Sequence, residues 1–290
     1  MGITLLDGSV GQELVHRHGA APTPLWSTSV MLENPDLVRQ VHEDYFAIGA
    51  QIATINSYTL IPERLARNGM GEHLETLART AMKQAVKARD RHGSGQVAGS
   101  LGPLGASYRT DFNHGIKDAE TEYEQLITML DEGVDFFLAE TVSSLNQVKN
   151  LVHVTRKYTD KPTWLSVSVD EKDGSKLRSG EDLAEVKKLL EPHIAAVMVN
   201  CSPPEVIETA LHTVKKFDRP YGANANGFTH ISKEFLKHNP TVDALKARKD
   251  LGPVAYADIA QTWVDQGATL IGGCCEIGPA HIAELNRRFF

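Results

Sequence analysis

Short apolar runs alternate with longer segments of helical periodicity along the whole chain. Most of the short runs are apolar at consecutive positions, which is typical of strands that are buried on both faces of a parallel sheet. The pattern predicts eight strands, at Ile3–Leu6, Gln51–Ile55, Gln96–Ser100, Asp135–Ala139, Thr163–Val169, Ile194–Val199, Pro220–Ala225 and Thr269–Ile271.

The segments between these runs repeat their apolar residues with the 3.6-residue period of an α-helix. One helical face before Gly93 carries Leu74, Leu77, Ala78, Ala81, Ala85 and Ala88. Further helices are predicted at Glu122–Asp131, Leu145–Tyr158, Asp182–Leu190, Val206–Phe217 and Asp258–Gln266. Pro279 opens the last helix, where its missing N–H costs little.

Strand-then-helix units repeated eight times within 290 residues predict an α/β fold, a single (β/α)8 TIM barrel over residues 1–290. An open doubly wound sheet would usually carry G-x-G-x-x-G after its first strand, whereas this chain has DGSVGQEL there. The longest irregular stretches are Gly102–Gly115 and Gly227–Pro253. Loops of this length in a barrel are more often functional than mere spacers.

Composition and charge narrow the classes of partner. With 41% hydrophobic and 23% charged residues, the chain is an ordinary globular sequence rather than a disordered one. The net charge is −7 and no basic block stands out, so nucleic acid is not an expected partner. No apolar run is long enough to span a bilayer, and the N-terminus lacks the pattern of a secretory signal. We therefore expect no membrane partner and a cytoplasmic location; the oligomeric state is not readable.

The carboxyl ends of the predicted strands carry the polar residues that a barrel would gather at one rim. These ends hold Asp7, Asn56, Gly99–Ser100, Glu140, Asp170, Cys201, Asn226 and Cys274–Cys275. The chain has only three cysteines, and all three fall on this rim. An odd, sparse set argues against a disulfide framework. Buried inert thiols are the alternative, but the shared rim favours a metal site.

The chemistry of such a site suits Zn²⁺, because thiolates select zinc over Mg²⁺ or Ca²⁺. Three protein ligands with one open position are the catalytic pattern of zinc. Three thiolates would leave the centre with a formal charge of −1, so a bound water would be poorly acidified. A substrate thiol would instead lose its proton and stay electron-rich. The arrangement therefore favours activation of a sulfur nucleophile toward an electrophilic carbon, such as an activated methyl group.

Several motifs resemble those of the homocysteine S-methyltransferases, over nearly the whole chain. They are Thr4–Gln12, Gly49–Tyr58, Ser100–Gly105, Ala139–Thr141, Val199–Glu205 and Thr269–Ile282. The most specific part is the NC of Asn200–Cys201 followed, roughly 70 residues later, by GGCC. The resemblance implies one homocysteine-binding (β/α)8 barrel domain, a zinc cofactor on three cysteines, and methyl transfer to homocysteine to give methionine.

By this resemblance, Cys201, Cys274 and Cys275 are the zinc ligands and Glu140 holds the substrate ammonium group. Asp7 belongs to the homocysteine pocket or caps the following helix, and Glu140 could alternatively start a helix. Asn226 resembles a family asparagine near the metal, or serves only as a turn residue. Gly8 and Gly102 are expected to let the backbone approach the ligand.

Two positions depart from the common family pattern. Many members have Gly-Thr after GGCC, whereas this chain has Glu276 and Ile277, which would bring negative charge near the metal unless Glu276 points away as a helix cap. The usual proline-asparagine turn is replaced by Ala225–Asn226. Both changes concern the local geometry and the donor more than the metal.

The methyl donor is inferred by elimination. Methyl-cobalamin users carry further large modules, and betaine users usually have a C-terminal extension that is absent after Phe290. A sulfonium donor, S-methylmethionine or S-adenosylmethionine, is therefore expected, with Trp26 or Tyr58 as candidate cation–π partners. Betaine or another donor, a selenocysteine or other thiol acceptor, and a non-catalytic zinc or thiol-binding module remain alternatives. A Schiff-base enzyme is disfavoured because no predicted strand carries a lysine near its carboxyl end.

Overall fold

The computed structural model describes residues 2–19, 23–25, 27–237 and 241–290. Its strands are β1 (Thr4–Leu5), β2 (Ile52–Thr54), β3 (Gln96–Leu101), β4 (Phe136–Val142), β5 (Thr163–Val167), β6 (Ile194–Asn200), β7 (Tyr221–Asn224) and β8 (Leu270–Ile271). Its α-helices are α1 (Val10–His18), α2 (Thr28–Glu33), α3 (Pro35–Ala47), α4 (Pro62–Arg67), α5 (Leu74–His92), α6 (Ile116–Asp131), α7 (Leu145–Tyr158), α8 (Pro204–Val214), α9 (Pro253–Asp265) and α10 (Pro279–Phe289). The 3₁₀ segments are η1 (Gly71–His73), η2 (Leu183–Leu189), η3 (Lys215–Phe217) and η4 (Val242–Ala244).

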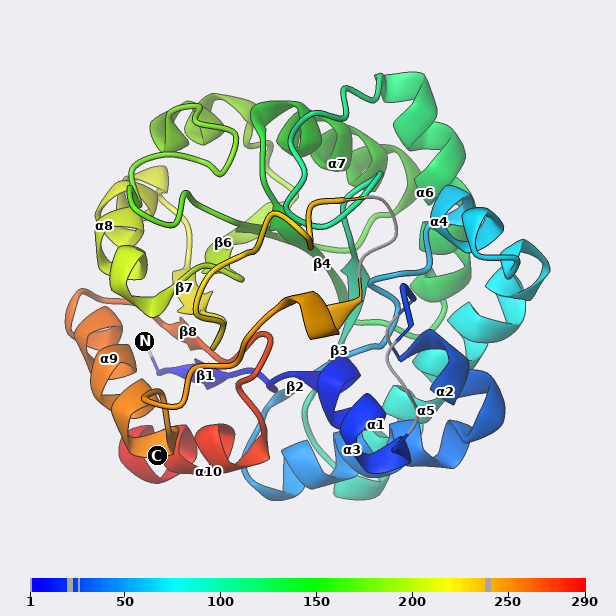
Figure 1. Cartoon of the computed structure of the whole chain (residues 1–290), viewed down its shortest axis with the longest axis horizontal. Coiled ribbons are helices and arrows are strands. Elements are labelled where there is room, and N and C mark those ends of the chain that lie inside the picture. Colours follow the sequence, from blue (N-terminus) through cyan, green and yellow to red (C-terminus); the bar gives the residue numbers. More distant parts are fainter. Residues whose placement is uncertain (1, 20–22, 26, 238–240) are drawn as a thin grey trace.

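The eight strands form one parallel sheet in the order β1-β8-β7-β6-β5-β4-β3-β2. A parallel bridge between Leu6 and Ile52 joins the two ends of this order and brings the sheet round into a barrel. Helices surround the ring of strands on its outside (Figure 1). The predicted TIM barrel is confirmed, with every predicted strand present.

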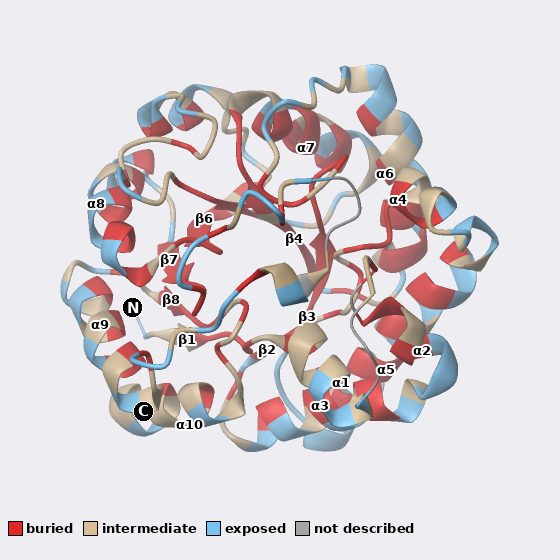
Figure 2. Cartoon of the chain, in the orientation of Figure 1, coloured by how far each residue is buried: buried red, intermediate tan, exposed pale blue. Residues whose placement is uncertain are grey.

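Two apolar layers hold the barrel together. Inside it, a cluster of buried side chains takes members from six strands or their ends, while a larger cluster fills the space between sheet and helices. The inner cluster is Leu6, Ile52, Ala98, Phe136, Leu138, Ala196, Met198 and Leu270. Figure 2 shows the burial concentrated on the strands and on the inner faces of the helices. The barrel interior is therefore a packed core, and chemistry is left to its open end.

The two-residue period of the strands determines which polar side chains face that open end. On β4, Phe136 and Leu138 point inward, and Glu140 follows in the same register. By the same period Ser100 follows Ala98 on β3. Ser100 Oγ donates a hydrogen bond of 2.5 Å to Glu140 Oε1, which ties the two strand ends together.

Several regions differ from the sequence-based expectation, among them the following. The predicted α-helix at Asp182–Leu190 is instead the 3₁₀ segment η2. Its buried residues Leu183 and Val186 and the partly buried Leu189 recur every third residue, a spacing that fits the three-residue turn of a 3₁₀-helix. Between β1 and β2 the chain forms α1, α2 and α3, which the sequence analysis did not assign.

No helix in the described part of the chain has the length and apolar character to cross a membrane.

The buried Tyr256 on α9 links the ends of two strands. Its hydroxyl accepts a hydrogen bond from the Ala225 N–H at 3.2 Å and donates one to the Gly272 carbonyl at 2.7 Å. Tyr256→Phe leaves both backbone groups without this partner, so we expect the free energy of unfolding to fall by about 1–3 kcal/mol. Denaturant titration of the reduced protein measures this change. Tyr158→Phe on the outer helix α7 is the control, with an expected change within about 0.5 kcal/mol; an equal loss in both variants would contradict the prediction.

Candidate metal and thiol site

The three cysteines meet at the barrel mouth because they follow β6 and β8, the two strands on either side of β7. Cys201 comes directly after β6, and its N–H donates to the Asn224 carbonyl on β7 at 3.1 Å. After β8, the Gly273 and Cys274 N–H groups donate to the Asp7 and Ala225 carbonyls. These bonds turn the Cys274–Cys275 segment back toward β6. As a result the three sulfur atoms lie within 4.8 Å of one another.

Two of these sulfurs are covalently joined in the structure. Cys201 and Cys274 form a disulfide, and Cys275 is a buried free thiol whose Sγ lies 3.9 Å from Cys201 Sγ. The sequence analysis expected no disulfide from so sparse a set of cysteines, and that expectation is wrong for this pair. The physical reason is the convergence itself, because strand ends that bring thiols together for a shared ion also bring them within bonding reach.

The donor set fits a thiolate-binding metal. In a tetrahedral zinc site with Zn–S bonds of about 2.3 Å, two sulfurs lie about 3.8 Å apart, close to the Cys201–Cys275 separation. The disulfide must be reduced before all three sulfurs can act as ligands. The described residues contain no other group of three metal-ligating side chains.

The long loop between β7 and α9 covers the sulfurs with apolar side chains. Cys201 and Cys275 belong to a buried cluster whose other members are Tyr108, Phe228, Ile231, Phe235 and Leu245. In the view of Figure 1 the gold and orange loop crosses the barrel mouth. Tyr108 comes from the other long irregular stretch, Gly102–Gly115. Both loops singled out from sequence therefore contribute to the enclosure of the thiols.

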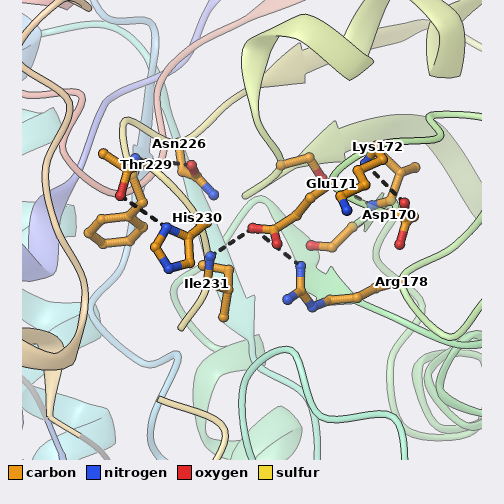
Figure 3. Close-up of polar contacts among 12 residues, drawn as sticks. Asp170, Glu171, Lys172, Arg178, Asn226, Thr229, His230 and Ile231 are labelled. Carbon is orange, nitrogen blue, oxygen red and sulfur yellow. Dashed lines mark hydrogen bonds and ion pairs between the residues drawn. The ribbon is translucent and has the colours of Figure 1, made fainter. Parts of the chain in front are cut away.

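One carboxylate fastens the covering loop to the rest of the mouth. Glu171, in the loop after β5, accepts a hydrogen bond from the Ile231 N–H at 2.7 Å and lies 3.8 Å from the Arg178 guanidinium. Figure 3 shows the Glu171 carboxylate between these two partners. The hydrogen bond from Ile231 to Glu171 thus joins the loop after β7 to the loop after β5.

A cavity beside the sulfurs is acidic. Asp7 and Glu140 line it together with the three cysteines, and no lysine, arginine or histidine is found among its described lining residues. Further lining residues are Gly8, Gln12, Asn56, Tyr58, Ser107, Tyr108, Thr141 and Asn224. Such a cavity favours ligands that carry positive charge.

The two cavity carboxyls have raised pKa values. Burial raises the pKa of Asp7 to about 8, opposed by hydrogen bonds from the Thr54 N–H and hydroxyl, and the nearby Glu140 charge adds to the rise. Burial likewise raises the pKa of Glu140 to about 7, and the Ser100 hydroxyl opposes it. Both carboxyls would gain from a cationic partner, because opposite charge stabilises the ionised form.

The pKa of the free thiol is also shifted. Burial raises the pKa of Cys275 to about 12, the Glu276 and Glu140 carboxylates add to the rise, and the Tyr108 hydroxyl is among the groups that oppose it. A bound divalent cation would reverse this balance, because a coordinating thiol is deprotonated outright.

The alternative helix-cap roles of the two carboxyls are excluded by the structure. Helix α1 has Ser9 as its N-cap, while Asp7 is bonded to Thr54. Glu140 lies inside β4, and the next helix has Ser144 as its N-cap. Both carboxyls therefore belong to the cavity wall.

Asn226 is used inside a turn. It is buried, its Oδ1 accepts the Phe228 N–H at 3.1 Å, and it is not among the described cavity-lining residues (Figure 3). The turn role is therefore the one that the structure displays, and an oxygen contribution to the metal stays a prediction. The neighbouring Asn224 lines the cavity instead, with its Oδ1 buried and without a hydrogen-bond partner.

The two glycines play packing roles. A Cβ on Gly8 would lie 2.2 Å from the Ile277 carbonyl oxygen, although Gly8 does line the cavity. A Cβ on Gly102 would lie 2.2 Å from the Tyr58 carbonyl oxygen, and Gly102 is not among the described lining residues. At Gly102 the structure shows one backbone segment packed against another, and the expected close approach to a ligand stays a prediction.

Among the candidate aromatic partners, Tyr58 lines the cavity and Trp26 lies outside the described residues. The Tyr58 hydroxyl is 2.8 Å from Ser107 Oγ, and the Arg64 guanidinium already lies 5.8 Å from the Tyr58 ring centroid.

Glu276 does not cap the last helix, whose N-cap is Gly278. Instead Glu276 exchanges two hydrogen bonds with the Gln12 side chain, of 2.5 and 2.6 Å.

Backbone strain marks several residues at the mouth of the barrel. Five described non-glycine residues have positive φ, and four of them, Tyr108, Thr141, Cys201 and Glu276, lie at this end of the barrel. Such conformations persist at functional sites only where tertiary contacts enforce them. Tyr108 and Asn224 were missed because neither stands in a recognisable motif; a polar residue late in an apolar strand is the sole signal for Asn224.

The comparison with protein families agrees with this geometry. The model described as Homocysteine S-methyltransferase matches residues 4–289. Homocysteine S-methyltransferase from Escherichia coli is 31% identical over 99% of this chain and 95% of its own length. Homocysteine S-methyltransferase YbgG from Bacillus subtilis is 30% identical over 98% of this chain and 93% of its own.

Solved structures are similar over the same span. The homocysteine methyltransferase MmuM from Escherichia coli in its metallated form has a TM-score of 0.84 and 30% identity, covering 99% of this chain and 96% of that one. Its oxidized form has a TM-score of 0.83 with the same identity and coverage. The fold therefore has counterparts of known structure.

Proposed function

Because the chain belongs to the homocysteine S-methyltransferase family, we propose that it moves the methyl group of a sulfonium donor onto homocysteine bound at a zinc ion. Methyl transfer to homocysteine, which forms methionine, is the activity that its relatives share. The proposal adds the identity of the ion, the class of donor and the roles of individual side chains. Its main support is the cavity, where carboxylates and sulfurs meet without a basic residue among the described lining.

Cys201, Cys274 and Cys275 would hold the zinc ion, as their sulfur-only donor set and their separations support. A zinc ion on three thiolates supplies a position where a substrate thiol is deprotonated yet remains nucleophilic. The chain's own part is to bring the three sulfurs together and to shield them under the apolar loop. Shielding also keeps water away from the sulfur nucleophile.

Glu140 and Asp7 would bind the ammonium group of homocysteine. Glu140 is the stronger candidate because it faces inward from the end of β4, and its raised pKa favours a cationic partner. Asp7 already accepts two hydrogen bonds from Thr54, so it has less capacity left for substrate. Holding the amino acid at this end would orient its thiol toward the cysteines.

The acidic cavity supports a donor with net positive charge. S-methylmethionine and S-adenosylmethionine both carry a sulfonium centre, whereas betaine is a neutral zwitterion. In the reaction the bond between the donor sulfonium sulfur and its methyl carbon breaks, and a bond from that carbon to the homocysteine sulfur forms. The donor leaves as a neutral thioether, and the thiol proton of homocysteine is released.

A donor panel tests this proposal. Purified protein, reduced and supplied with Zn²⁺, is incubated with homocysteine and S-methylmethionine, S-adenosylmethionine or betaine, and methionine is quantified. We expect at least one sulfonium donor to give a kcat/KM about 100-fold or more above that of betaine, a difference of about 2.7 kcal/mol. Equal or better turnover with betaine would overturn the donor assignment. Selenocysteine, and thiols other than homocysteine, are then tested as acceptors to find the range of nucleophiles that the protein methylates.

A further inference from the structure

Tyr108 occupies an unusual backbone conformation beside the sulfurs. Its φ is 62°, a region in which a bulky aromatic residue is a genuine outlier. The side chain is enclosed, with only 3% of its surface exposed. A conformation of this kind persists only when surrounding contacts hold it in place.

Two contacts hold the ring. The Arg178 guanidinium lies over it, 5.1 Å from the ring centroid, and Phe235 meets it edge-on at 5.9 Å. Arg178 is itself oriented by the Glu171 carboxylate at 3.8 Å, as Figure 3 shows. The covering loop and the loop after β5 thus fix Tyr108 from two sides. Its orientation is therefore set by the whole mouth rather than by its own short segment.

The Tyr108 hydroxyl makes no hydrogen bond of good geometry with the described residues, although the Asn226 side chain lies near it. The hydroxyl oxygen is buried and makes no such hydrogen bond, although Tyr108 lines the same cavity as the cysteines. Buried hydroxyl groups are nearly always hydrogen-bonded in native proteins, so an orphan at a functional site calls for an explanation. Tyr108 and Cys275 belong to the same small buried cluster and line the same cavity, so the hydroxyl lies on the side of the ring that faces the sulfurs. A thiol is a weak acceptor, whereas a metal-bound thiolate carries charge and accepts more strongly.

We propose that the Tyr108 hydroxyl donates a hydrogen bond to the Cys275 thiolate when the three cysteines bind a divalent cation, and so acts as a positioning residue of the metal site. The inference rests on the metal-binding part of the proposed function and not on the methyl donor. The hydroxyl orients Cys275 Sγ and withdraws electron density from it. Partners of this kind around metal ligands commonly affect metal affinity by about 10–100-fold when they are removed.

Cobalt substitution gives a readout that does not depend on turnover. Reduced wild-type protein and Tyr108→Phe are loaded anaerobically with Co²⁺, and the sulfur-to-cobalt charge-transfer bands are recorded without homocysteine or donor. Loss of a hydrogen bond makes the thiolate easier to oxidise, so we expect the bands of Tyr108→Phe to move to lower energy. We also expect its Co²⁺ dissociation constant, measured against a competing chelator, to rise about tenfold.

Tyr123→Phe is the matched control. Tyr123 is a buried tyrosine on α6 whose hydroxyl donates to the Gly102 carbonyl at 2.6 Å, and it is not among the described cavity-lining residues. We expect this variant to keep the wild-type bands and cobalt affinity. Unchanged bands in Tyr108→Phe, or equal shifts in the two variants, would overturn the proposal. Because no methyl donor is present, failure of the sulfonium assignment would leave this result untouched.

Discussion

Cys201→Ser is expected to lose tight metal binding and to lower kcat/KM for methyl transfer by about 1,000-fold or more. The serine hydroxyl is a poor ligand for a metal that prefers thiolates, so the site keeps only two of its three sulfurs. A thousandfold loss corresponds to about 4 kcal/mol of transition-state stabilisation, a scale that metal activation commonly supplies. Metal content after gel filtration and methionine formation with the best donor measure the two effects.

The comparison must be made on reduced proteins. In the oxidised form Cys201 is bonded to Cys274, which lies 73 residues further along the chain, so the variant would also lose a cross-link. Under reducing conditions the circular dichroism spectrum should match that of the wild type, because a serine fits the space of the buried cysteine. Full activity with wild-type metal content would remove Cys201 from the site.

Glu140→Gln is expected to raise the KM for homocysteine by about 10–100-fold, with a smaller effect on kcat. The amide keeps the size of the carboxylate and can still accept the Ser100 hydrogen bond, but it cannot pair with an ammonium charge. Charge-assisted hydrogen bonds contribute about 1.5–3 kcal/mol, which corresponds to this change in KM. Steady-state kinetics at saturating donor measure it, and the exposed Glu132→Gln serves as control.

The pH dependence of the KM for homocysteine distinguishes the effect of the Glu140 charge from the effect of its shape. The pKa of Glu140 is raised to about 7, so its carboxyl takes up a proton as the pH falls through neutrality and loses its ammonium partner. The KM of the wild type for homocysteine should therefore rise as the pH is lowered from 8 to 6, a range taken around that pKa of about 7. In Glu140→Gln this component should be absent. Parallel pH profiles in the two proteins would argue against the ammonium role.

The pattern of apolar strands was enough to predict most of the fold and to bring the three cysteines and Glu140 to one end of the barrel. Strands buried on both faces leave long apolar runs, and their carboxyl ends must share one rim of a barrel. That topological rule alone brought Cys201 together with Cys274 and Cys275, and it placed Glu140 at the mouth. The 3₁₀ form of η2 was missed because apolar residues at every third position satisfy both helical periods over so short a segment.

The remaining features depend on contacts between distant segments. Asn224 and Asn226 stand two residues apart, so strand alternation assigns both to the same face. The chain leaves the strand after Asn224, and Asn226 then bonds to Phe228 within the turn. The conformation of Tyr108 is likewise imposed by Arg178 and Phe235. Neither outcome is encoded in a local pattern.

The loop over the sulfurs is closed at its own base. Thr229 N–H donates to the Lys246 carbonyl, and Arg248 N–H donates to the Gly227 carbonyl, so its two arms are bonded to each other. Because this clasp fixes where the segment leaves and rejoins the barrel, the residues beyond it can vary without moving the acceptor side. Sequence changes within this segment are therefore expected to alter the cover of the sulfurs while the described cavity lining stays in place.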